Sequence, residues 1–331
     1  MIIRIGKNIF GDRMEYFSKQ VRDEIARNEF GQCQTCIKAE LSAILHISGS
    51  IHLTGKEKLG LSVVTESAGV ARRVIKLLKT CYRLESETRV EQVEKLGKHH
   101  RYTLIIHPQE GLTELLYELG MMTRERSLEG SIAPNLVQER CCRSSFLRGA
   151  FLAGGSITDP QKKTYHLELV THNEEFANGL IYLMSLMNIK AKSAKRKEQT
   201  VVYLKDSEAI GQFLSVINAY HGFMKLEEVK VIKGLRGEVN RIVNCETANL
   251  EKTLSAAWKQ VEIINELINN GDYHQLSPSL KQTADLRLEY PEANLKELGE
   301  LHTPALSKSA VNHRLRLICQ LGKKNSKTEG I

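Results

Sequence analysis

The sequence lacks any apolar run of the roughly 18 to 20 residues that a membrane-spanning helix requires. Its first residues, MIIRIGKN, also lack the apolar segment and the small-residue cleavage site of a secretory signal peptide. We therefore expect a cytoplasmic protein with no membrane partner. The 331 residues, of which 41% are hydrophobic and 26% charged, suit a globular chain of two or three domains.

The number of cysteines is odd, whereas a framework of disulfides needs an even number. Their number, seven in a long chain, favours reduced thiols. Cys33, Cys36, Cys141 and Cys142 precede two predicted helices, so their sulfur atoms would converge if those helices were neighbours. A structural zinc site normally uses two spaced pairs, however, and buried cysteines often act as small apolar side chains. We therefore expect no metal ion and no other cofactor, with a zinc site as the less favoured alternative.

Tryptophan is nearly absent from the sequence. The one tryptophan, Trp258, belongs to an apolar stripe at helical spacing, which predicts that it packs in a core.

Lysine and arginine total 47 against 39 aspartate and glutamate, which gives a net charge of +8. This excess favours polyanionic partners, although only weakly.

A repeat with a constant offset of 106 positions organises the N-terminal part of the chain. Residues 41–51 (LSAILHISGSI) match residues 147–157 (LRGAFLAGGSI), and residues 61–65 match residues 167–171. A shift that holds across helix and strand patterns indicates a duplicated unit. In the second copy Gly149 and Ala153 are four positions apart, a spacing that allows two helices to pack closely.

Each copy predicts the order helix, two strands, helix, two strands, helix. We therefore predict an α+β domain over residues 1–224, with pseudo-repeats at about 16–120 and 139–220. The first predicted helix covers residues 16–30, and Ser18 is its expected N-cap.

A run of basic residues marks the second copy. Its members are Lys190, Lys192, Lys195, Arg196 and Lys197. This run either contacts a phosphate backbone or forms the solvated charge of an edge strand.

Two such units, each opening with a small-residue helix that ends in Gly-Ser-Ile, resemble the LAGLIDADG homing endonuclease scaffold. The resemblance implies two opening helices packed across a pseudo-two-fold axis, and two antiparallel sheets that form a saddle for duplex DNA. In that family an acidic residue at the bottom of each helix holds the divalent metal ions of the nuclease reaction. Here Ser48 and Gly154 occupy those positions, while His46 and Leu152 replace the other acid of the motif. We therefore predict no enzymatic activity, with a metal-dependent endonuclease that uses a non-standard site as the alternative.

The C-terminal part of the chain contains only helical patterns. Residues 225–270 predict a helical linker made of two helices, the second capped by Thr247 or Asn249. Residues 271–331 predict an all-α domain of three short helices, the first of which begins at Pro278.

The second and third of these short helices predict a helix-turn-helix. Asn294 and Glu297 have the form of a capping box, and Ser307 is positioned to cap the last helix. The turn between the two helices is short, as in DNA-binding helix-turn-helix domains. From Lys308 onward the chain has six basic residues against the single acid Glu329, which favours DNA as the partner.

The last helix has an apolar and a polar face. Val311, Leu315 and Ile318 are expected to face inward together with Ala310. Arginine and asparagine can read base edges, while lysine suits phosphate. The predicted DNA-binding residues are Lys296, Ser307, Lys308, Ser309, Asn312, His313, Arg314 and Arg316.

A degenerate LAGLIDADG unit followed by a helix-turn-helix resembles the WhiA family of bacterial regulators. The resemblance covers nearly the whole chain. The strings that carry it are residues 36–43 (CIKAELSA), 146–157 (FLRGAFLAGGSI), 243–249 (VNCETAN) and 307–316 (SKSAVNHRLR).

Membership of this family implies a non-enzymatic, cytoplasmic and nucleoid-associated DNA-binding protein. It further implies a transcriptional regulator linked to sporulation, cell division and chromosome segregation. The expected partner is double-stranded DNA in promoter regions, together with another regulatory protein or RNA polymerase. A division scaffold for which DNA binding is incidental is the alternative. The target site, activation or repression, and the oligomeric state stay open.

Overall fold

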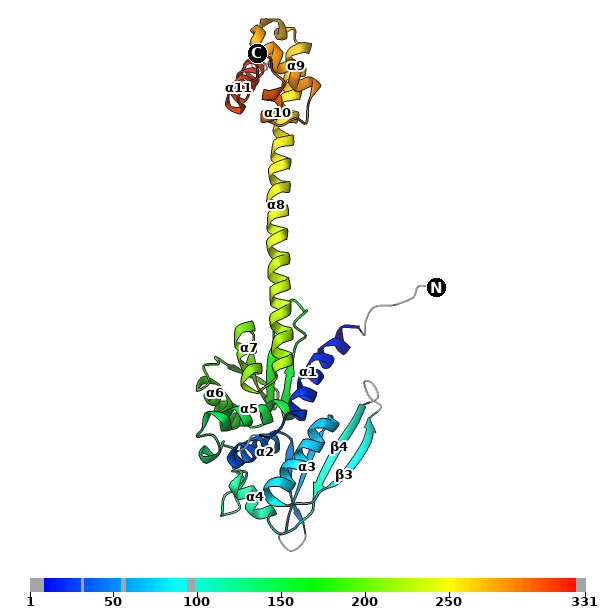
Figure 1. The fold of residues 1–331 in the computed structure, drawn as a ribbon, viewed down its shortest axis with the longest axis vertical. Helices are drawn as coiled ribbons and strands as arrows, with labels where there is room; N and C mark the ends of the chain where they lie inside the picture. The colour runs from blue at the N-terminus through cyan, green and yellow to red at the C-terminus, as the bar shows by residue number, and fades with distance from the viewer. Residues whose placement is uncertain (1–8, 31–32, 55–57, 94–98, 326–331) are drawn as a thin grey trace, which may run out of the picture. The chain divides into compact units, whose positions relative to one another are not determined.

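The computed structural model describes residues 9–30, 33–54, 58–93 and 99–325 (Figure 1). The chain divides into two compact units, residues 1–232 and 233–331, which we describe one at a time. The helix α8 (Tyr220–Asn269) begins in the first unit and ends in the second. No helix in the described residues combines the length and the apolar character that crossing a membrane requires.

The first unit contains the predicted duplication. The first copy has the elements α2 (Gln34–Ser48), β1 (Gly49–Thr54), β2 (Lys58–Thr65), α3 (Ala68–Tyr82), β3 (Glu87–Val93), β4 (His99–Ile106) and α4 (Leu112–Glu118). After the short 3-10 helix η1 (Pro134–Leu136), the second copy has α5 (Arg140–Gly154), β5 (Gly155–Ile157), β6 (Leu167–Thr171), α6 (Glu174–Ser185), β7 (Lys192–Arg196), β8 (Gln199–Leu204) and α7 (Ser207–Val216). The order helix, two strands, helix, two strands, helix is therefore confirmed in both copies.

Each copy forms one antiparallel four-stranded sheet, with the orders β1-β2-β4-β3 and β5-β6-β8-β7. The strand register preserves the sequence offset, because Ile51 pairs with Leu61 in the first sheet and Ile157 pairs with Leu167 in the second. The two predicted saddle sheets are thus built with the same pairing.

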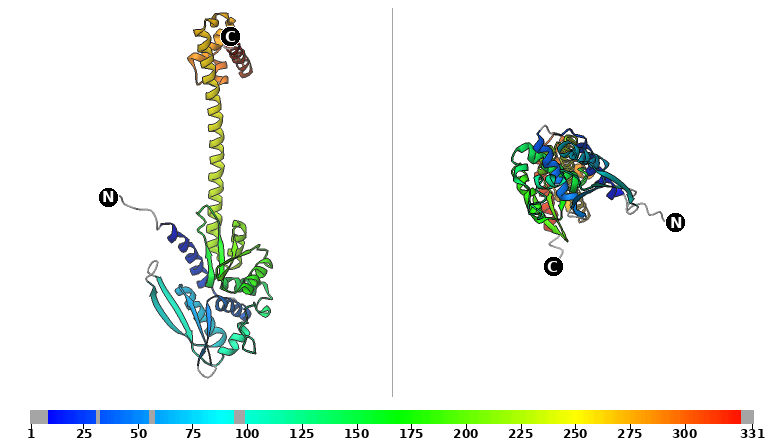
Figure 2. Two further views of the ribbon diagram at one scale, coloured as in Figure 1. Left: turned by 180° about the vertical axis from the view of Figure 1, so that it is seen from behind. Right: turned by 90° about the horizontal axis from the view of Figure 1, so that it is seen from below.

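The opening helices α2 and α5 lie side by side at the centre of the first unit (Figures 1 and 2). Gly149 permits this contact, because a methyl group in its place would overlap the carbonyl oxygen of Glu40 and lie 3.0 Å from Ala43 Cβ. Ala43 is the residue of the first copy that corresponds to Gly149. The predicted packing role of Gly149 is confirmed.

The helix before the first copy differs from its prediction. α1 (Ile9–Arg27) begins before residue 16, so Ser18 lies in its interior and is not an N-cap. The Ser18 hydroxyl donates to Ile157 O and accepts from Ile157 N, both at 2.8 Å. Ser18 therefore joins α1 to the end of β5, at Ile157, a long-range contact that local capping preferences cannot reveal.

The helix α8 also differs from its prediction. The expected break at Thr247 or Asn249 does not occur, and the helix continues through both residues. Gly234 and Gly237 lie within it, and outside their own helix backbone a methyl group at either position would have no atom within 4 Å. Trp258 is 53% exposed, so the expectation that it packs in a core is wrong.

The second unit is a small all-α domain. Its elements are the end of α8, the 3-10 helix η2 (Asp272–Gln275), α9 (Pro278–Glu289), α10 (Leu295–Glu300) and α11 (Lys308–Asn325). Its core consists of Ile264, Leu267, Ala284, Leu298, Val311, Leu315 and Ile318. Because Ile264 and Leu267 belong to α8, the last turns of that helix are part of the domain. The predicted capping box of Asn294 and Glu297 is present at the start of α10.

Candidate nucleic-acid interface

The turn between α10 and α11 is fixed by backbone and side-chain contacts. Leu306 N donates to Gly299 O at 2.9 Å, and a methyl group at Gly299 would overlap the carbonyl oxygen of Leu306. Only glycine therefore permits this approach without a backbone shift. His302 is buried in the turn, with Nδ1 2.7 Å from Leu298 O and Nε2 2.9 Å from Thr283 Oγ1 of α9. These contacts hold α10 and α11 in one orientation relative to α9.

The face of α11 that packs on the domain is the predicted one. Val311, Leu315 and Ile318 are buried, and Ala310 is half-buried. Ser307 Oγ accepts from Ala310 N at 3.2 Å, so Ser307 caps the helix as expected. Its hydroxyl is therefore engaged at the helix start.

The opposite face of α11 is polar and open to solvent. Of the eight predicted DNA-binding residues, four are exposed on this helix: Lys308, Ser309, His313 and Arg316. Arg316, Ser309 and His313 lie on this face, and Lys308 is exposed at the start of the helix. All four side chains can donate hydrogen bonds to phosphate or base edges.

The remaining predicted residues are placed differently. Arg314 is half-buried and turns back to α9, where its Nη1 donates to Ser279 O at 3.2 Å and lies 3.4 Å from Thr283 Oγ1. Asn312 is half-buried and lines a small hollow that Gln260 of α8 also lines. Lys296 is exposed on α10, with its Nζ 3.9 Å from a carboxylate oxygen of Glu300.

Charge within the second unit is distributed unevenly along the sequence. Residues 271–307 contain three basic and six acidic residues, whereas residues 308–331 contain six basic and one acidic residue. A polyanion is therefore attracted to the part of the domain that begins with α11.

In the first unit, the basic run is partly neutralised. Every residue of β7 is exposed. Lys195 Nζ lies 3.5 Å from Glu174, and Arg196 Nη1 lies 3.2 Å from Glu168. The run should therefore attract phosphate less strongly than its number of basic residues suggests. Lys192, on the same strand, is also exposed and could contact phosphate.

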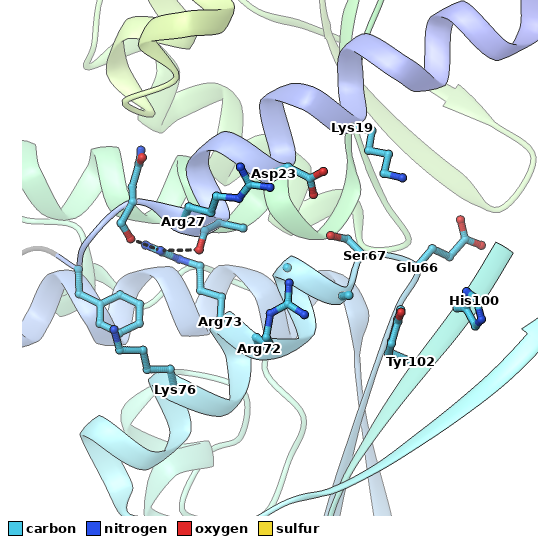
Figure 3. A pocket seen from close by; sticks show the side chains of 15 residues that line it. Lys19, Asp23, Arg27, Glu66, Ser67, Arg72, Arg73, Lys76, His100 and Tyr102 are labelled. Carbon is cyan, nitrogen blue, oxygen red and sulfur yellow. Dashed lines mark hydrogen bonds between the residues drawn. The ribbon is translucent and has the colours of Figure 1, made fainter.

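A polar hollow of about 450 Å³ lies beside the start of α3 (Figure 3). Its charged side chains come mainly from α1 and α3: Lys19, Asp23, Arg27, Glu66, Arg72, Arg73 and Lys76. Arg73 is buried and bound to Glu40, but the other basic groups still outnumber Asp23 and Glu66, which suits contact with phosphate. The hollow is not among the predicted sites, because its residues come from separate segments of the sequence.

Ser48 and Gly154, the residues at the ends of the two opening helices, are both closely packed. Ser48 Oγ donates to Ile44 O at 2.8 Å and so is turned onto its own helix. At Gly154 a Cβ atom would lie 2.6 Å from Val170 O and 2.9 Å from Ile47 Cγ2. The backbone around Gly154 thus leaves no room for a side chain.

The other substituted motif positions are also packed. Leu152 is buried. The imidazole of His46 stacks on Phe176 with ring centroids 5.0 Å apart, and its Nδ1 lies 2.9 Å from Ser42 O. Burial lowers the pKa of His46, so the ring is neutral at neutral pH.

Comparison with known proteins supplies the family. The "Probable cell division protein WhiA" of Alkaliphilus metalliredigens is 41% identical over 308 residues, which are 92% of this chain and 96% of the relative. The chain belongs to the WhiA family. The protein of the same name from Desulforamulus reducens is 43% identical over 309 residues, 93% of this chain and 95% of the relative.

Family models and a solved structure agree with this assignment. The WhiA N-terminal LAGLIDADG-like domain matches residues 34–122, the WhiA LAGLIDADG-like domain matches residues 143–236, and the WhiA C-terminal HTH domain matches residues 239–322. The crystal structure of full-length DUF199/WhiA from Thermatoga maritima is 25% identical, with a TM-score of 0.58 over 93% of this chain and 98% of that one. The chain thus has LAGLIDADG-like domains followed by a helix-turn-helix domain.

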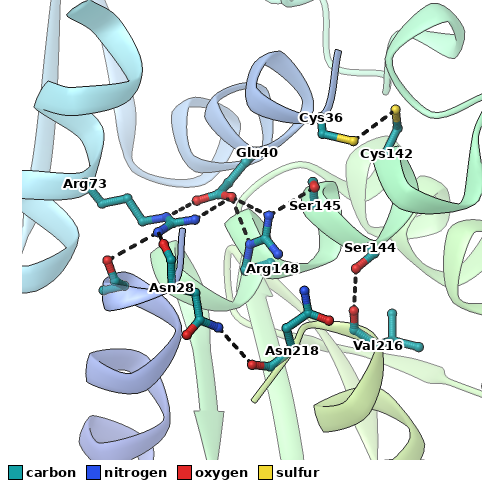
Figure 4. Close-up of polar contacts among 11 residues, drawn as sticks. Asn28, Cys36, Glu40, Arg73, Cys142, Ser144, Ser145, Arg148, Val216 and Asn218 are labelled. Carbon is teal, nitrogen blue, oxygen red and sulfur yellow. Dashed lines mark hydrogen bonds and ion pairs between the residues drawn. The ribbon is translucent and has the colours of Figure 1, made fainter. Parts of the chain in front are cut away.

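Two of the strings that carry the family resemblance meet in a buried ion cluster (Figure 4). Glu40 of α2 accepts hydrogen bonds from Arg148 Nε at 2.8 Å and from Arg73 Nη2 at 3.0 Å. The Glu40, Arg73 and Arg148 side chains are almost wholly buried. Sequence reasoning missed this cluster, although charged residues inside the apolar opening helices were its signal.

Three sulfur atoms meet at the N-terminal ends of α2 and α5. The Sγ atoms of Cys33, Cys36 and Cys142 all lie within 4.8 Å of one another. Cys36 and Cys142 correspond under the 106-residue offset, and their Sγ atoms are 3.5 Å apart (Figure 4). The convergence expected for neighbouring helices therefore occurs for three of the four cysteines.

Proposed function

We propose that the chain is a non-enzymatic DNA-binding protein that places α11 in the major groove of duplex DNA. One observation carries this proposal: Ser309, His313 and Arg316 are exposed on the face of α11 that lies away from the domain core, and Lys308 is exposed at the start of the helix. In helix-turn-helix proteins the second helix of the motif reads base edges from such a face. Arg316 is the proposed base reader, and Lys308 the proposed phosphate contact.

The other predicted residues contribute in different ways to this proposal. Ser307 orients the helix start, and Arg314 holds α11 against α9. Half-buried Asn312 and exposed Lys296 are given secondary contacts in this proposal. The basic sequence after residue 308 adds long-range attraction for the phosphate backbone.

We further propose that DNA binding serves cell division, because the relatives are named as cell division proteins. In this proposal the chain acts in the cytoplasm, at the nucleoid, as a transcriptional regulator of promoter regions. Its partners there include another regulatory protein or RNA polymerase, and its processes include chromosome segregation and sporulation.

The first unit is proposed to assist binding without cutting DNA. The engaged hydroxyl of Ser48 and the closed space at Gly154 support the absence of a nuclease metal site. The polar hollow beside α3 and the exposed Lys192 supply phosphate contacts or a surface for a partner. Incubation of supercoiled plasmid with Mg²⁺ or Mn²⁺ tests the endonuclease alternative, and clean protein-dependent nicking would overturn the non-enzymatic proposal.

The main experiment measures equilibrium binding to a genomic fragment selected by the full-length protein. Replacing both Lys308 and Arg316 with alanine should weaken binding by at least about tenfold, since one base contact contributes about 1–3 kcal/mol. Lys259→Ala removes the same kind of charge from α8 and serves as the control. Unchanged affinity of the double variant would refute the role of α11.

A division scaffold is the second candidate function. Removal of residues 271–331 distinguishes the two, because a scaffold that does not need DNA would still support division in cells. We expect the truncated chain to fail.

A further inference from the structure

We propose that Cys33, Cys36 and Cys142 form a binding site for a thiophilic divalent metal ion, with Zn²⁺ as the natural occupant. The proposal concerns the first unit and is independent of DNA binding by α11. It revises the expectation that the cysteines are separate buried thiols, because the structure brings three sulfur atoms within 4.8 Å of one another.

The distances suit tetrahedral coordination. Zinc–sulfur bonds are about 2.3 Å, so two thiolates on one tetrahedral zinc ion lie about 3.8 Å apart. The Sγ atoms of Cys36 and Cys142 are 3.5 Å apart, and Cys33 Sγ lies within 4.8 Å of both. Only small side-chain adjustments are needed to close the three sulfur atoms around one ion.

The positions of the three residues are defined by helix starts. Cys33 is the N-cap residue of α2, Cys36 lies in its first turn, and Cys142 lies in the first turn of α5. Three thiolates and one Zn²⁺ carry a net charge of −1, which the partial positive charge of helix N-termini stabilises. The two helices therefore favour the charged, metal-loaded cluster.

The sequence disfavours a zinc site because structural zinc sites normally use two spaced pairs, whereas Cys141 and Cys142 are adjacent. The structure removes this objection, because the cluster needs only Cys142 from that pair. Cys36 and Cys142 are buried, whereas Cys33 is exposed and gives solvent access to the site. Water or the exposed Cys141 would supply the fourth ligand.

The ion would have a structural role. It would join α2 to α5 at their N-terminal ends, far along both helices from Ser48 and Gly154. Because the folded chain holds the three thiolates together and the unfolded chain does not, metal binding should stabilise the fold.

The test measures metal binding to the full-length chain kept reduced and free of chelators. Zinc content by mass spectrometry should be about one ion per chain. Titration with Co²⁺ should give thiolate charge-transfer absorption in the near ultraviolet and intense visible bands of tetrahedral cobalt. Zinc should raise the melting temperature of the metal-free chain by about 5 °C or more.

Variants assign the ligands. Cys36→Ser and Cys142→Ser should lose the cobalt spectrum while keeping the far-ultraviolet circular dichroism of the wild-type chain. Cys245→Ser, which changes an exposed thiol on α8, should bind cobalt like the wild type. The wild-type titration needs no variant, so a variant that fails to fold leaves the test intact.

Three results would overturn the proposal. The first is a wild-type chain that contains no zinc and does not change the absorption spectrum of hydrated Co²⁺. The second is a folded Cys36→Ser or Cys142→Ser chain that binds cobalt as tightly as the wild type. The third is an intact mass that shows a Cys36–Cys142 disulfide in the reduced preparation.

Discussion

Glu40 of α2 and Arg148 of α5 form an ion pair in the interior of the first unit, with Arg148 Nε 2.8 Å from the carboxylate of Glu40. Arg73 of α3 binds the same carboxylate and also donates to Asn28 O at 2.5 Å. One buried acid therefore joins both copies of the repeat. Because a buried carboxylate is costly unless its charge and hydrogen bonds are satisfied, this cluster favours the arrangement that brings α2, α3 and α5 together.

Glu40→Ala should lower the free energy of unfolding by about 3–5 kcal/mol, because it leaves two buried guanidinium groups without their acid. Urea denaturation measures the change. Glu114→Ala, which removes an exposed acid of α4, is the control and should stay within about 0.5 kcal/mol of the wild type. A loss of less than about 1 kcal/mol for Glu40→Ala would contradict the structural importance of the cluster.

Two glycine substitutions should have opposite effects. Gly149→Ala places a methyl group against Glu40 O and Ala43, so overpacking should cost about 1–3 kcal/mol. Gly234 lies in α8, where a methyl group would have no atom within 4 Å outside the backbone of its own helix. Gly234→Ala should therefore stabilise the chain by up to about 1 kcal/mol, because alanine favours the helix more than glycine does. Thermal unfolding of both variants tests this, and equal effects would show that the close contact between α2 and α5 is not formed.

Much of the fold follows from the sequence because its signals are local or repeated. The 106-residue offset predicts both copies, and the structure pairs Ile51 with Leu61 and Ile157 with Leu167 at that same offset. The capping box at Asn294 likewise needs only four consecutive residues. Ser18, Glu40 and Trp258 depend instead on which distant elements meet, so neither periodicity nor capping preference could place them correctly.

The candidate site is only partly predictable for the same reason. Helical periodicity separates Val311, Leu315 and Ile318 from the exposed Lys308 and Arg316. It cannot show that Arg314 reaches Ser279 of α9, since that contact depends on the packing of two helices. The offset brings the thiols to matching helix starts, but only the packing of those helices shows which sulfur atoms meet.

The stability of the first unit should fall as the solution is acidified below the ordinary histidine pKa of about 6.5. Burial lowers the pKa of His46 in the folded chain. Below a pH of about 6.5 the unfolded chain therefore binds a proton at this histidine more readily than the folded chain does. This group contributes at most about 1.4 kcal/mol per pH unit, and its contribution is complete above a pH of about 6.5. His46→Phe should flatten the pH dependence measured by urea denaturation between about pH 7 and about pH 5.

The control for this experiment is His172→Phe, which changes an exposed histidine. It should leave the pH dependence of stability as it is in the wild type. The account of His46 fails if the two variants behave alike.

Arg314 and Arg316 should separate stability from DNA binding. Arg314→Ala removes the contacts with Ser279 and Thr283, and should lower the melting temperature of the second unit. Arg316→Ala removes an exposed side chain, and should weaken DNA binding with little change in stability. Calorimetry and fluorescence anisotropy on both variants measure the two effects, and a reversed pattern would exchange the roles that we give them.

The central claim is that the exposed face of α11 selects DNA sequence. Its most direct test is the selection of genomic fragments by the full-length wild-type chain and by Arg316→Ala, followed by sequencing at a salt concentration that suppresses non-specific binding. The account predicts a small set of fragments enriched by the wild type and lost with the variant. Enrichment of the same fragments by both proteins would contradict it.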